Sequence, residues 1–314
     1  MVLRRFNGKV FLARWPDTGE RHSSGCPSYD PSSNPAAVHE LEDGGIEIRA
    51  SFSLSASSPR QNDRPALSNK SRQTETVVQH EQLDLAGVLH ELWRRASFDK
   101  WFPAMAGRRN WGVVKHHLSI AASAVHVGPW LLGDHLLAVD KFSRSTPGFV
   151  EMQTQRLRSM IDEHGVAVLL APVKSVERSR FGIRVEFFHL PSVSFYKSSM
   201  LQIGEQLRCL PAGHRLIALA IIDVRGRNFH IRDAGAITVT SQWLPYDMPS
   251  DAITIEALVA HDQRFMVRHG HIRENKEVAI KLGGVHDGAM ILSDPSSNYG
   301  YRITTDGSIL EGQG

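Results

Sequence analysis

Hydrophobic residues between positions 83 and 125 recur at intervals of three and four in two successive segments. In the first segment they are Leu85, Val88, Leu89, Leu92, Trp93 and Ala96. In the second they are Trp111, Val114, Leu118, Ala121, Ala122 and Val125. This spacing lines up one side of an α-helix, and Asp84 and Asn110 precede the two segments as residue types that cap helix N-termini. Pro103 and Gly107 interrupt the pattern between the segments, so we predict a helical hairpin.

The pattern changes after residue 165 to long hydrophobic runs, which are typical of β-strands. The predicted strands are 165–176, 181–190, 214–224, 229–241, 278–282, 289–293 and 301–305. The first four form two antiparallel pairs with short polar connections. Helical spacing predicts three further helices, at 149–163, 198–207 and 252–265. Gly165 suits the end of the first of these because glycine readily adopts positive φ.

The N-terminal part of the chain has weaker patterning. Residues 2–14 predict a β-hairpin that turns at Asn7-Gly8, and residues 46–54 alternate like a strand. Residues 55–79 contain too few large hydrophobic side chains to offset the entropy of ordering, so we expect a disordered linker. The predicted segments are a β-hairpin region (1–54), the linker (55–79), a helical region (80–165) and an α+β domain (166–314). The predicted fold class is α+β, with a central helical hairpin and a C-terminal antiparallel sheet with flanking helices.

Composition narrows the compartment and the class of partner. The 314 residues are 41% hydrophobic and carry a formal charge of +3, which permits an acidic partner such as nucleic acid without requiring one. Two cysteines, Cys26 and Cys209, give no disulfide framework and favour a reducing compartment. The sequence has no run of about eighteen apolar residues that would predict a membrane span, and residues 1–15 lack the pattern of a signal peptide. We expect a cytoplasmic protein without membrane contact.

Basic and indole side chains gather in and around the turn of the predicted hairpin. The set is Arg94, Arg95, Lys100, Trp101, Arg108, Arg109, Trp111 and Lys115. Asp99 is the single acidic residue among them. Guanidinium groups bind phosphate bidentately and tryptophan stacks on unpaired bases, so the set predicts a nucleic-acid-binding surface. The alternative is that the tryptophans close the end of the hairpin and the basic groups only solvate it.

Two other groups of residues suggest metal chemistry. His22 and Cys26 are spaced as two zinc ligands on a loop can be, whereas a structural zinc site needs four; otherwise they are a surface histidine and an isolated cysteine. Glu256, Asp287 and Asp294 faintly match the clustered carboxylates that hold a divalent ion in restriction-endonuclease-like domains. The acidic-x-lysine expected on the next strand is missing, so an intact nuclease centre is not expected. The motifs of serine hydrolases, dinucleotide-binding domains and P-loop proteins are absent from the sequence.

Three motifs of the sequence are similar to one family. They are HSSGCPSYDP at 22–31, LDLAGVLHELW to FDKWFPAMAGRRNW at 83–111, and SQWLPYD to RFMVRHG at 241–270. Together they resemble the bacterial domain of unknown function DUF1173, most specifically through the pattern W-x-PAMAG-[RK]-R-x-W. The resemblance covers nearly the whole chain and implies a setting on plasmids and integrative conjugative elements, but no activity. It also implies a C-x-C pair that completes a zinc site with His22 and Cys26, so zinc is expected only if such a pair precedes the sequence as given.

Three functional hypotheses follow. The leading one is a non-enzymatic accessory protein of a bacterial mobile element that contacts nucleic acid or a nucleoprotein through the basic and indole residues. The second is a degenerate metal-dependent nuclease that uses the three carboxylates. The third is a structural module that binds a protein partner.

Overall fold

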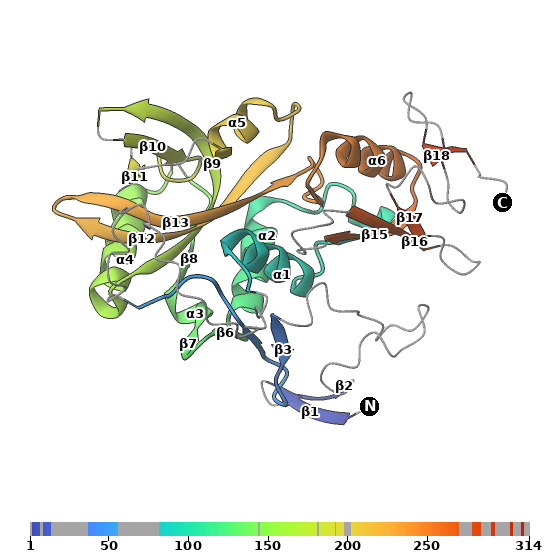
Figure 1. Cartoon of the computed structure of the whole chain (residues 1–314), viewed down its shortest axis with the longest axis horizontal. Coiled ribbons are helices and arrows are strands. Elements are labelled where there is room, and N and C mark those ends of the chain that lie inside the picture. The colour runs from blue at the N-terminus through green and yellow to red at the C-terminus, as the bar shows by residue number, and fades with distance from the viewer. Residues whose placement is uncertain are drawn as a thin grey trace, which may run out of the picture.

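Figure 1 shows the computed structural model of the chain. The structure describes residues 2–6, 9–13, 37–55, 82–143, 145–180, 182–191, 193–197, 202–269, 278–283, 290–292, 302–303 and 309–310. The fold is α+β, as predicted, and its described residues form a seven-stranded sheet, two four-stranded sheets and two two-stranded sheets, with helices packed against the larger ones (Figure 1). Except for Ser55, the predicted linker 55–79 lies outside the described residues.

The helices are α1 (Leu85–Arg95), η2 (Pro103–Met105, a short 3-10 turn), α2 (Trp111–Ala122), α3 (Leu132–His135), α4 (Phe149–His164), α5 (Gln202–Arg208) and α6 (Pro249–Ala260). The strands of the first half are β1 (Val2–Phe6), β2 (Lys9–Ala13), β3 (Val38–Glu40), β4 (Ile46–Ile48), β5 (Lys100–Trp101), β6 (Val125–Val127), β7 (Trp130–Leu131) and β8 (Leu136–Ala138). The strands of the second half are β9 (Ala167–Ser179), β10 (Gly182–Phe187), β11 (Phe195–Lys197), β12 (Arg215–Arg225), β13 (Asn228–Val239), β14 (Pro245–Tyr246), β15 (Arg264–His269), β16 (Val278–Gly283), β17 (Met290–Leu292), β18 (Arg302–Ile303) and β19 (Ile309–Leu310).

The large sheet has the strand order β10-β11-β13-β12-β9-β8, and β9 also pairs with β10, so five of its strands close into a ring. The two predicted antiparallel pairs, β9 with β10 and β12 with β13, are confirmed. Alternate residues of β9 and β12 point to opposite faces. One face packs against α1 and α2, and the other packs against α4 through Leu157 and Ile161. Both faces are therefore buried, which explains the long hydrophobic runs.

Local signals in the sequence set the ends of the predicted helices. The Asp84 side chain accepts from the Gly87 N–H at 2.8 Å, and the Asn110 side chain accepts from the Val113 N–H at 3.2 Å. Gly165 ends α4 with a φ of 79°, as predicted. The two helices of the predicted hairpin are confirmed, but the chain between them forms β5 and η2 rather than a simple turn.

The start of α1 lies directly on β13 at Gly235. A Cβ atom at this position would lie 2.1 Å from the backbone nitrogen of Ala86 and 2.5 Å from the carbonyl carbon of Leu85. Real non-bonded atoms do not approach so closely, so only glycine lets the helix backbone pack against the strand backbone here. This contact sets how closely the start of α1 packs on β13.

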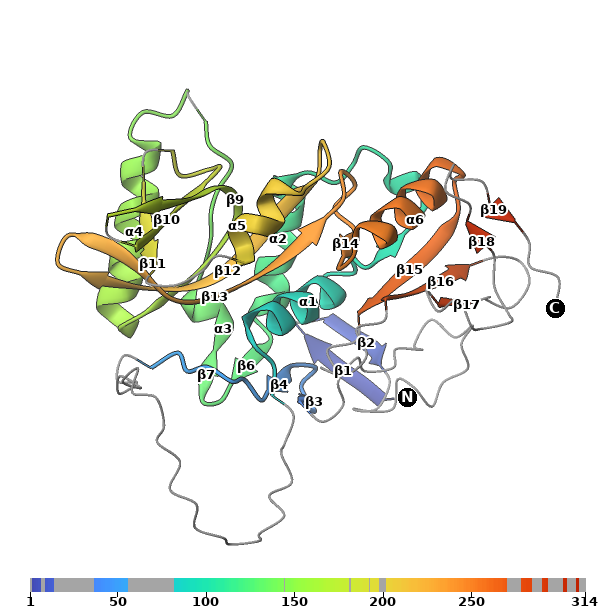
Figure 2. The same cartoon turned by 45° about the horizontal axis from the view of Figure 1, so that its top comes forward.

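A second, four-stranded sheet has the order β17-β16-β15-β5, and α6 lies over it (Figure 2). The core between helix and sheet consists of Trp101, Leu244, Tyr246, Ala252, Ile255, Leu258, Phe265 and Val267. The prediction that Phe265 belongs to the helix was wrong, because α6 ends at Ala260 and Asp262 adopts a φ of 54° before β15 begins. The hydrophobic spacing continued past the helix end because Phe265 contacts the same core from the strand.

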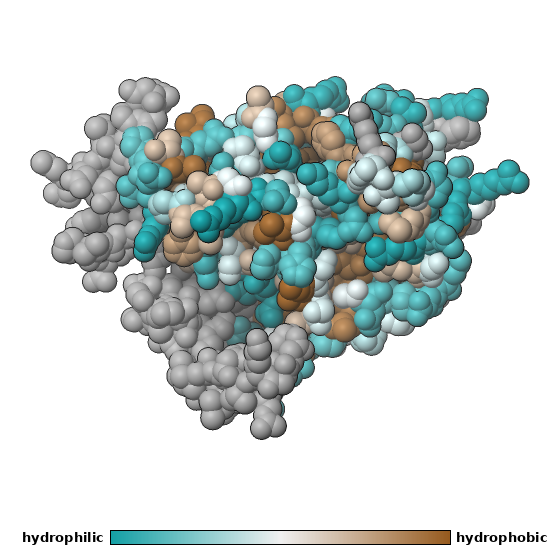
Figure 3. All heavy atoms as spheres, turned by 180° about the vertical axis from the view of Figure 1, so that it is seen from behind, coloured by the Kyte–Doolittle hydropathy of each residue, from teal (hydrophilic) through white to brown (hydrophobic). Residues whose placement is uncertain are grey.

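A third sheet has the order β3-β4-β6-β7 and shares its core with α1, α2 and the large sheet. The predicted strand 46–54 is shorter, since only Ile46–Ile48 is regular strand. The surface seen in Figure 3 carries its hydrophobic residues in small groups between hydrophilic ones, which is ordinary for a protein surface. No helix of the described ranges combines the length and the hydropathy that a membrane crossing requires.

Candidate nucleic-acid interface

Both tryptophans of the predicted surface are buried. Trp101 is 1% exposed, and Trp111 is 5% exposed. The Trp111 indole N–H donates to the Val139 carbonyl at 2.8 Å, and its ring stacks on His189 and on Trp243 with centroid distances of 5.9 and 6.0 Å. Neither indole offers a free face to an unpaired base, so the expectation that they stack on nucleic acid is corrected. The alternative, in which they close the protein interior, describes their position.

Arg109 holds the segment between α1 and α2 in place through hydrogen bonds to its backbone. Its guanidinium group donates to the carbonyls of Phe98, at 3.2 Å, and of Lys100, and lies over the rings of Phe98 and Trp101 at 5.2 and 5.7 Å. Burial lowers the pKa of Arg109 to about 10, although the charge of Asp99 opposes this shift. The side chain therefore stays charged at neutral pH, and its donors are used by the protein's own backbone.

Three further cations of the predicted set are also engaged within the protein. Arg94 donates twice to Glu91, at 2.6 and 2.9 Å, and Arg95 donates to the Gly44 carbonyl at 2.9 Å. Lys115 on α2 pairs with Asp140. These positions were predicted to face a ligand, whereas each of these side chains contacts a group of the protein.

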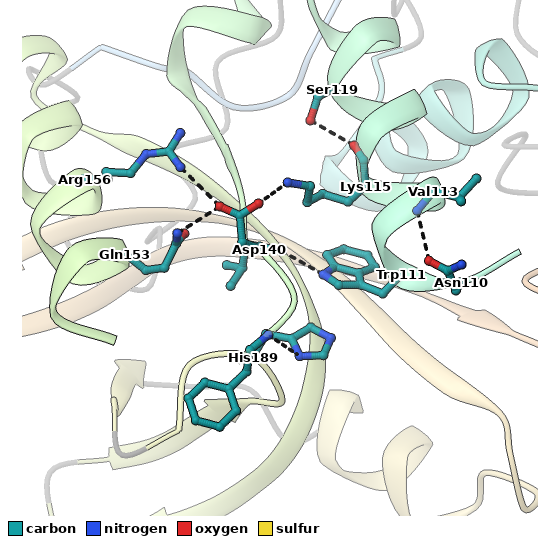
Figure 4. Close-up of polar contacts among 11 residues, drawn as sticks. Asn110, Trp111, Val113, Lys115, Ser119, Asp140, Gln153, Arg156 and His189 are labelled. Atoms are coloured by element: carbon teal, nitrogen blue, oxygen red, sulfur yellow. Dashed lines mark hydrogen bonds and ion pairs between the residues drawn. The ribbon is translucent and has the colours of Figure 1, made fainter. Parts of the chain in front are cut away.

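Asp140 forms polar contacts with side chains of two helices, α2 and α4 (Figure 4). Besides Lys115, it accepts from Gln153 at 2.9 Å and contacts Arg156 at 3.4 Å. Burial raises the pKa of Asp140, but the hydrogen bond and the charge of Lys115, aided by Gln153 and Arg156, outweigh burial, so the pKa is lowered overall. The cluster ties α2 to α4 across the segment that follows β8.

Arg108 and Lys100 remain at the surface, and two residues join them that the sequence pattern did not single out. Phe102 is 39% exposed, and the Arg264 guanidinium lies over its ring at 6.0 Å. Arg108 and Arg264 are exposed, and Lys100 is partly exposed. No carboxylate of the described ranges forms an ion pair with Lys100, Arg108 or Arg264. These cations are therefore available to an external anion.

Strand pairing brings these residues together. β5 and β15 are antiparallel, with Trp101 opposite Phe265 and Lys100 opposite Met266. Side chains alternate along a strand, so while Trp101 and Phe265 enter the core below α6, the next positions face outward. We call the outward set the basic sheet face: Lys100, Phe102, Arg264 and Met266. On the other side of β15, the register pairs Met266 with Lys281 of β16.

The candidate catalytic and metal residues fall into two groups. Asp287, Asp294, His22 and Cys26 lie outside the described residues. Glu256 on α6 accepts from the buried His214 ring at 2.6 Å, and the other ring nitrogen of His214 lies 2.8 Å from the Tyr246 hydroxyl. Burial, aided by the charge of Glu256, raises the pKa of Tyr246 to about 12. In the ranges that the structure describes, no three His, Cys, Asp or Glu side chains are grouped to hold a metal ion.

A family model described as a protein of unknown function, DUF1173, matches residues 1–283 of the chain. The chain belongs to the DUF1173 family. The match ends at the last residue of β16, so every residue of the basic sheet face lies within the DUF1173 region. No curated protein and no solved structure matches this DUF1173 chain. The family description states no activity, so the function has to be argued from the geometry.

Proposed function

We propose that this DUF1173 protein is a non-enzymatic accessory protein of a bacterial mobile element that binds nucleic acid through the basic sheet face. The observation that carries the proposal is the placement of Arg264 over the exposed ring of Phe102, with Lys100 two residues earlier, on the side of β5 and β15 opposite to the core. Arg108, in the turn before α2, adds a further exposed cation to the same segment. The mobile-element setting and a cytoplasmic location are supported only by the sequence resemblance and composition.

Electrostatics favours a polyanion over a neutral partner at this face. A lysine or arginine that contacts a phosphate releases condensed counterions, and this release supplies most of the sequence-independent affinity for nucleic acid. An arginine also offers two parallel donors that match a phosphate. Arg264 is held over Phe102 without an ion pair to a carboxylate of the described residues, so binding a phosphate would not require an existing salt bridge to break.

Fluorescence anisotropy with labelled single- and double-stranded DNA at two salt concentrations tests the proposal. We expect affinity to fall as salt rises, and the double variant Lys100→Gln with Arg264→Gln to reduce the salt slope by about 1.5 in log–log units, because each phosphate contact contributes roughly 0.7 to 0.9. The matched control replaces Arg225 and Arg227, which are exposed at the turn between β12 and β13. In Figure 1 this turn lies at the opposite end of the molecule from β5 and β15.

Two results would reject the proposal. One is a wild-type protein that binds neither DNA at low salt. The other is a control variant that lowers the slope as much as the test variant, since binding would then depend on total charge rather than on this face. The same samples incubated with plasmid and Mg²⁺ or Mn²⁺ measure the nuclease hypothesis, and the accessory role expects no cleavage.

A further inference from the structure

We infer that the basic sheet face selects single-stranded over double-stranded nucleic acid, with Phe102 as the platform on which an unpaired base stacks. The inference rests on the proposed function, which by itself requires only contacts to phosphate. It concerns a different interaction, because phosphate contacts do not distinguish strand types through the bases, whereas an aromatic ring on a sheet can stack only on a base with an accessible face.

The exposure of Phe102 follows from its neighbours on both sides. Trp101 is buried in the core below α6, so the alternation of the strand turns the next side chain outward. Pro103 follows, and a residue before proline is held in extended backbone. Phe102 has φ −135° and ψ 143°, which continues the strand geometry of β5 past its last paired residue. The ring is therefore held outward by the backbone rather than by a loose loop.

The surroundings of Phe102 suit a base with a phosphate on each side. Arg264, on the neighbouring strand β15, lies over one face of the ring with its guanidinium group 6.0 Å from the centroid, so a base would stack on the other face. Lys100 lies two residues earlier on β5, a step of roughly 6.8 Å along an antiparallel strand. Stacking on an aromatic ring between cations is the usual chemistry of single-strand binding surfaces, where each stacked base contributes without regard to sequence.

A duplex does not fit this arrangement equally well. Bases inside a duplex are stacked on both sides, so the Phe102 ring could reach a base face only by inserting between base pairs, at an unstacking cost of about a few kcal/mol per step. Groove reading uses an inserted helix or a two-stranded ribbon. Here the helix of this unit, α6, packs against the opposite face of the sheet through Ile255 and Leu258. Without such an insertion, the face contacts duplex DNA through its cations alone.

The test compares three probes that differ in base availability. They are a labelled oligothymidine of about 12 nucleotides, within the usual site size, a strand of the same length with abasic sites in place of the bases, and a duplex of that length. The variants are Phe102→Leu, which keeps bulk without a ring, and Phe102→Trp, which restores stacking. Phe188→Leu is the control, because Phe188 is 53% exposed and follows β10 at the other end of the molecule (Figure 1).

We expect the wild-type protein to bind the oligothymidine at least tenfold more tightly than the abasic strand or the duplex. Phe102→Leu should weaken oligothymidine binding about tenfold or more, the range found when one stacking residue is removed, and leave the other two probes unchanged. Phe102→Trp should restore the affinity, and circular dichroism should show all variants folded.

Equal affinity for all three probes, or a Phe102→Leu variant as active as the Phe188→Leu control, would overturn the inference. In that case the proposed function would still stand if the wild-type protein bound DNA and the Lys100→Gln, Arg264→Gln double variant showed the expected smaller salt slope. If no probe is bound at low salt, the proposed function itself fails.

Discussion

Replacing Arg109 with alanine tests whether this residue stabilises the fold beneath the interface or itself contacts nucleic acid. The side chain donates to the carbonyls of Phe98 and Lys100 and covers the ring of Trp101. Hydrogen bonds from a charged donor contribute roughly 1.5 to 3 kcal/mol each, so the two bonds together amount to about 3 to 6 kcal/mol. Relief of the buried charge opposes this loss. Lowering the pKa from 12.5 to about 10 corresponds to about 3 kcal/mol.

The difference between these opposing effects is about 0 to 3 kcal/mol, so we expect Arg109→Ala to lower the free energy of unfolding by about 1.5 kcal/mol. Urea denaturation followed by tryptophan fluorescence measures it, since Trp101 and Trp111 are buried in the two cores on either side of the Arg109 segment. The neighbouring substitution Arg108→Ala is the matched control. Arg108 is exposed, and surface substitutions of this kind change stability by less than about 0.5 kcal/mol.

Nucleic-acid affinity of the same two variants completes the comparison. We expect Arg108→Ala to weaken binding without loss of stability, and Arg109→Ala to lose stability while the folded fraction still binds. The reasoning would be refuted if Arg109→Ala were as stable as wild type and no longer bound DNA. That result would place the Arg109 guanidinium on the ligand rather than on the backbone carbonyls.

Three further predictions concern the framework. Gly235→Ala should lower the free energy of unfolding by about 3 kcal/mol or prevent folding, because the new methyl group meets the Ala86 backbone at 2.1 Å; thermal denaturation measures this. Asp140→Asn should cost about 1 kcal/mol, less at high salt, because the ion pairs are partly exposed; urea midpoints at low and high salt check it. Burial, followed by the charge of His164, lowers the pKa of His135 from 6.5, so the unfolded chain takes up the proton first. Stability should therefore fall as pH drops below about 6.5, and His135→Gln should flatten this dependence in urea midpoints measured from pH 7.5 to 5.

The elements that the sequence predicts well are those with local causes. Asp84 and Asn110 cap their helices through bonds to N–H groups three residues away, and Gly165 ends α4 through its own backbone conformation. The long strands β9 and β12 are equally clear, because burial on both faces requires continuous hydrophobic runs. Each of these signals acts within a few residues, so it can be recognised without knowing the fold.

The candidate site is different because its residues come from separate parts of the chain. Phe102 and Arg264 meet only through the pairing of β5 with β15, and no spacing in the sequence encodes that pairing. The prediction that Trp101 and Trp111 stack on nucleic acid was wrong for a related reason. An indole beside arginines occurs both in nucleic-acid surfaces and in cores with cation–π contacts, and only the position of α6 over Trp101 separates the two. Pro103 was the local signal that could have identified Phe102, because a residue before proline favours extended backbone and so continues the strand past Trp101.

The buried residues of the original set nevertheless determine the proposed interface. Strand geometry links the sides of adjacent residues, so burying Trp101 obliges Lys100 and Phe102 to face outward. Arg109 holds the Lys100 carbonyl, and the contact of α1 with Gly235 sets how closely the start of α1 packs on β13. A change at any of these inner positions should lower the free energy of unfolding while the folded fraction still binds nucleic acid, whereas changes at Phe102 or Arg264 should alter binding alone. That difference distinguishes the residues that position the basic sheet face from the residues that contact nucleic acid.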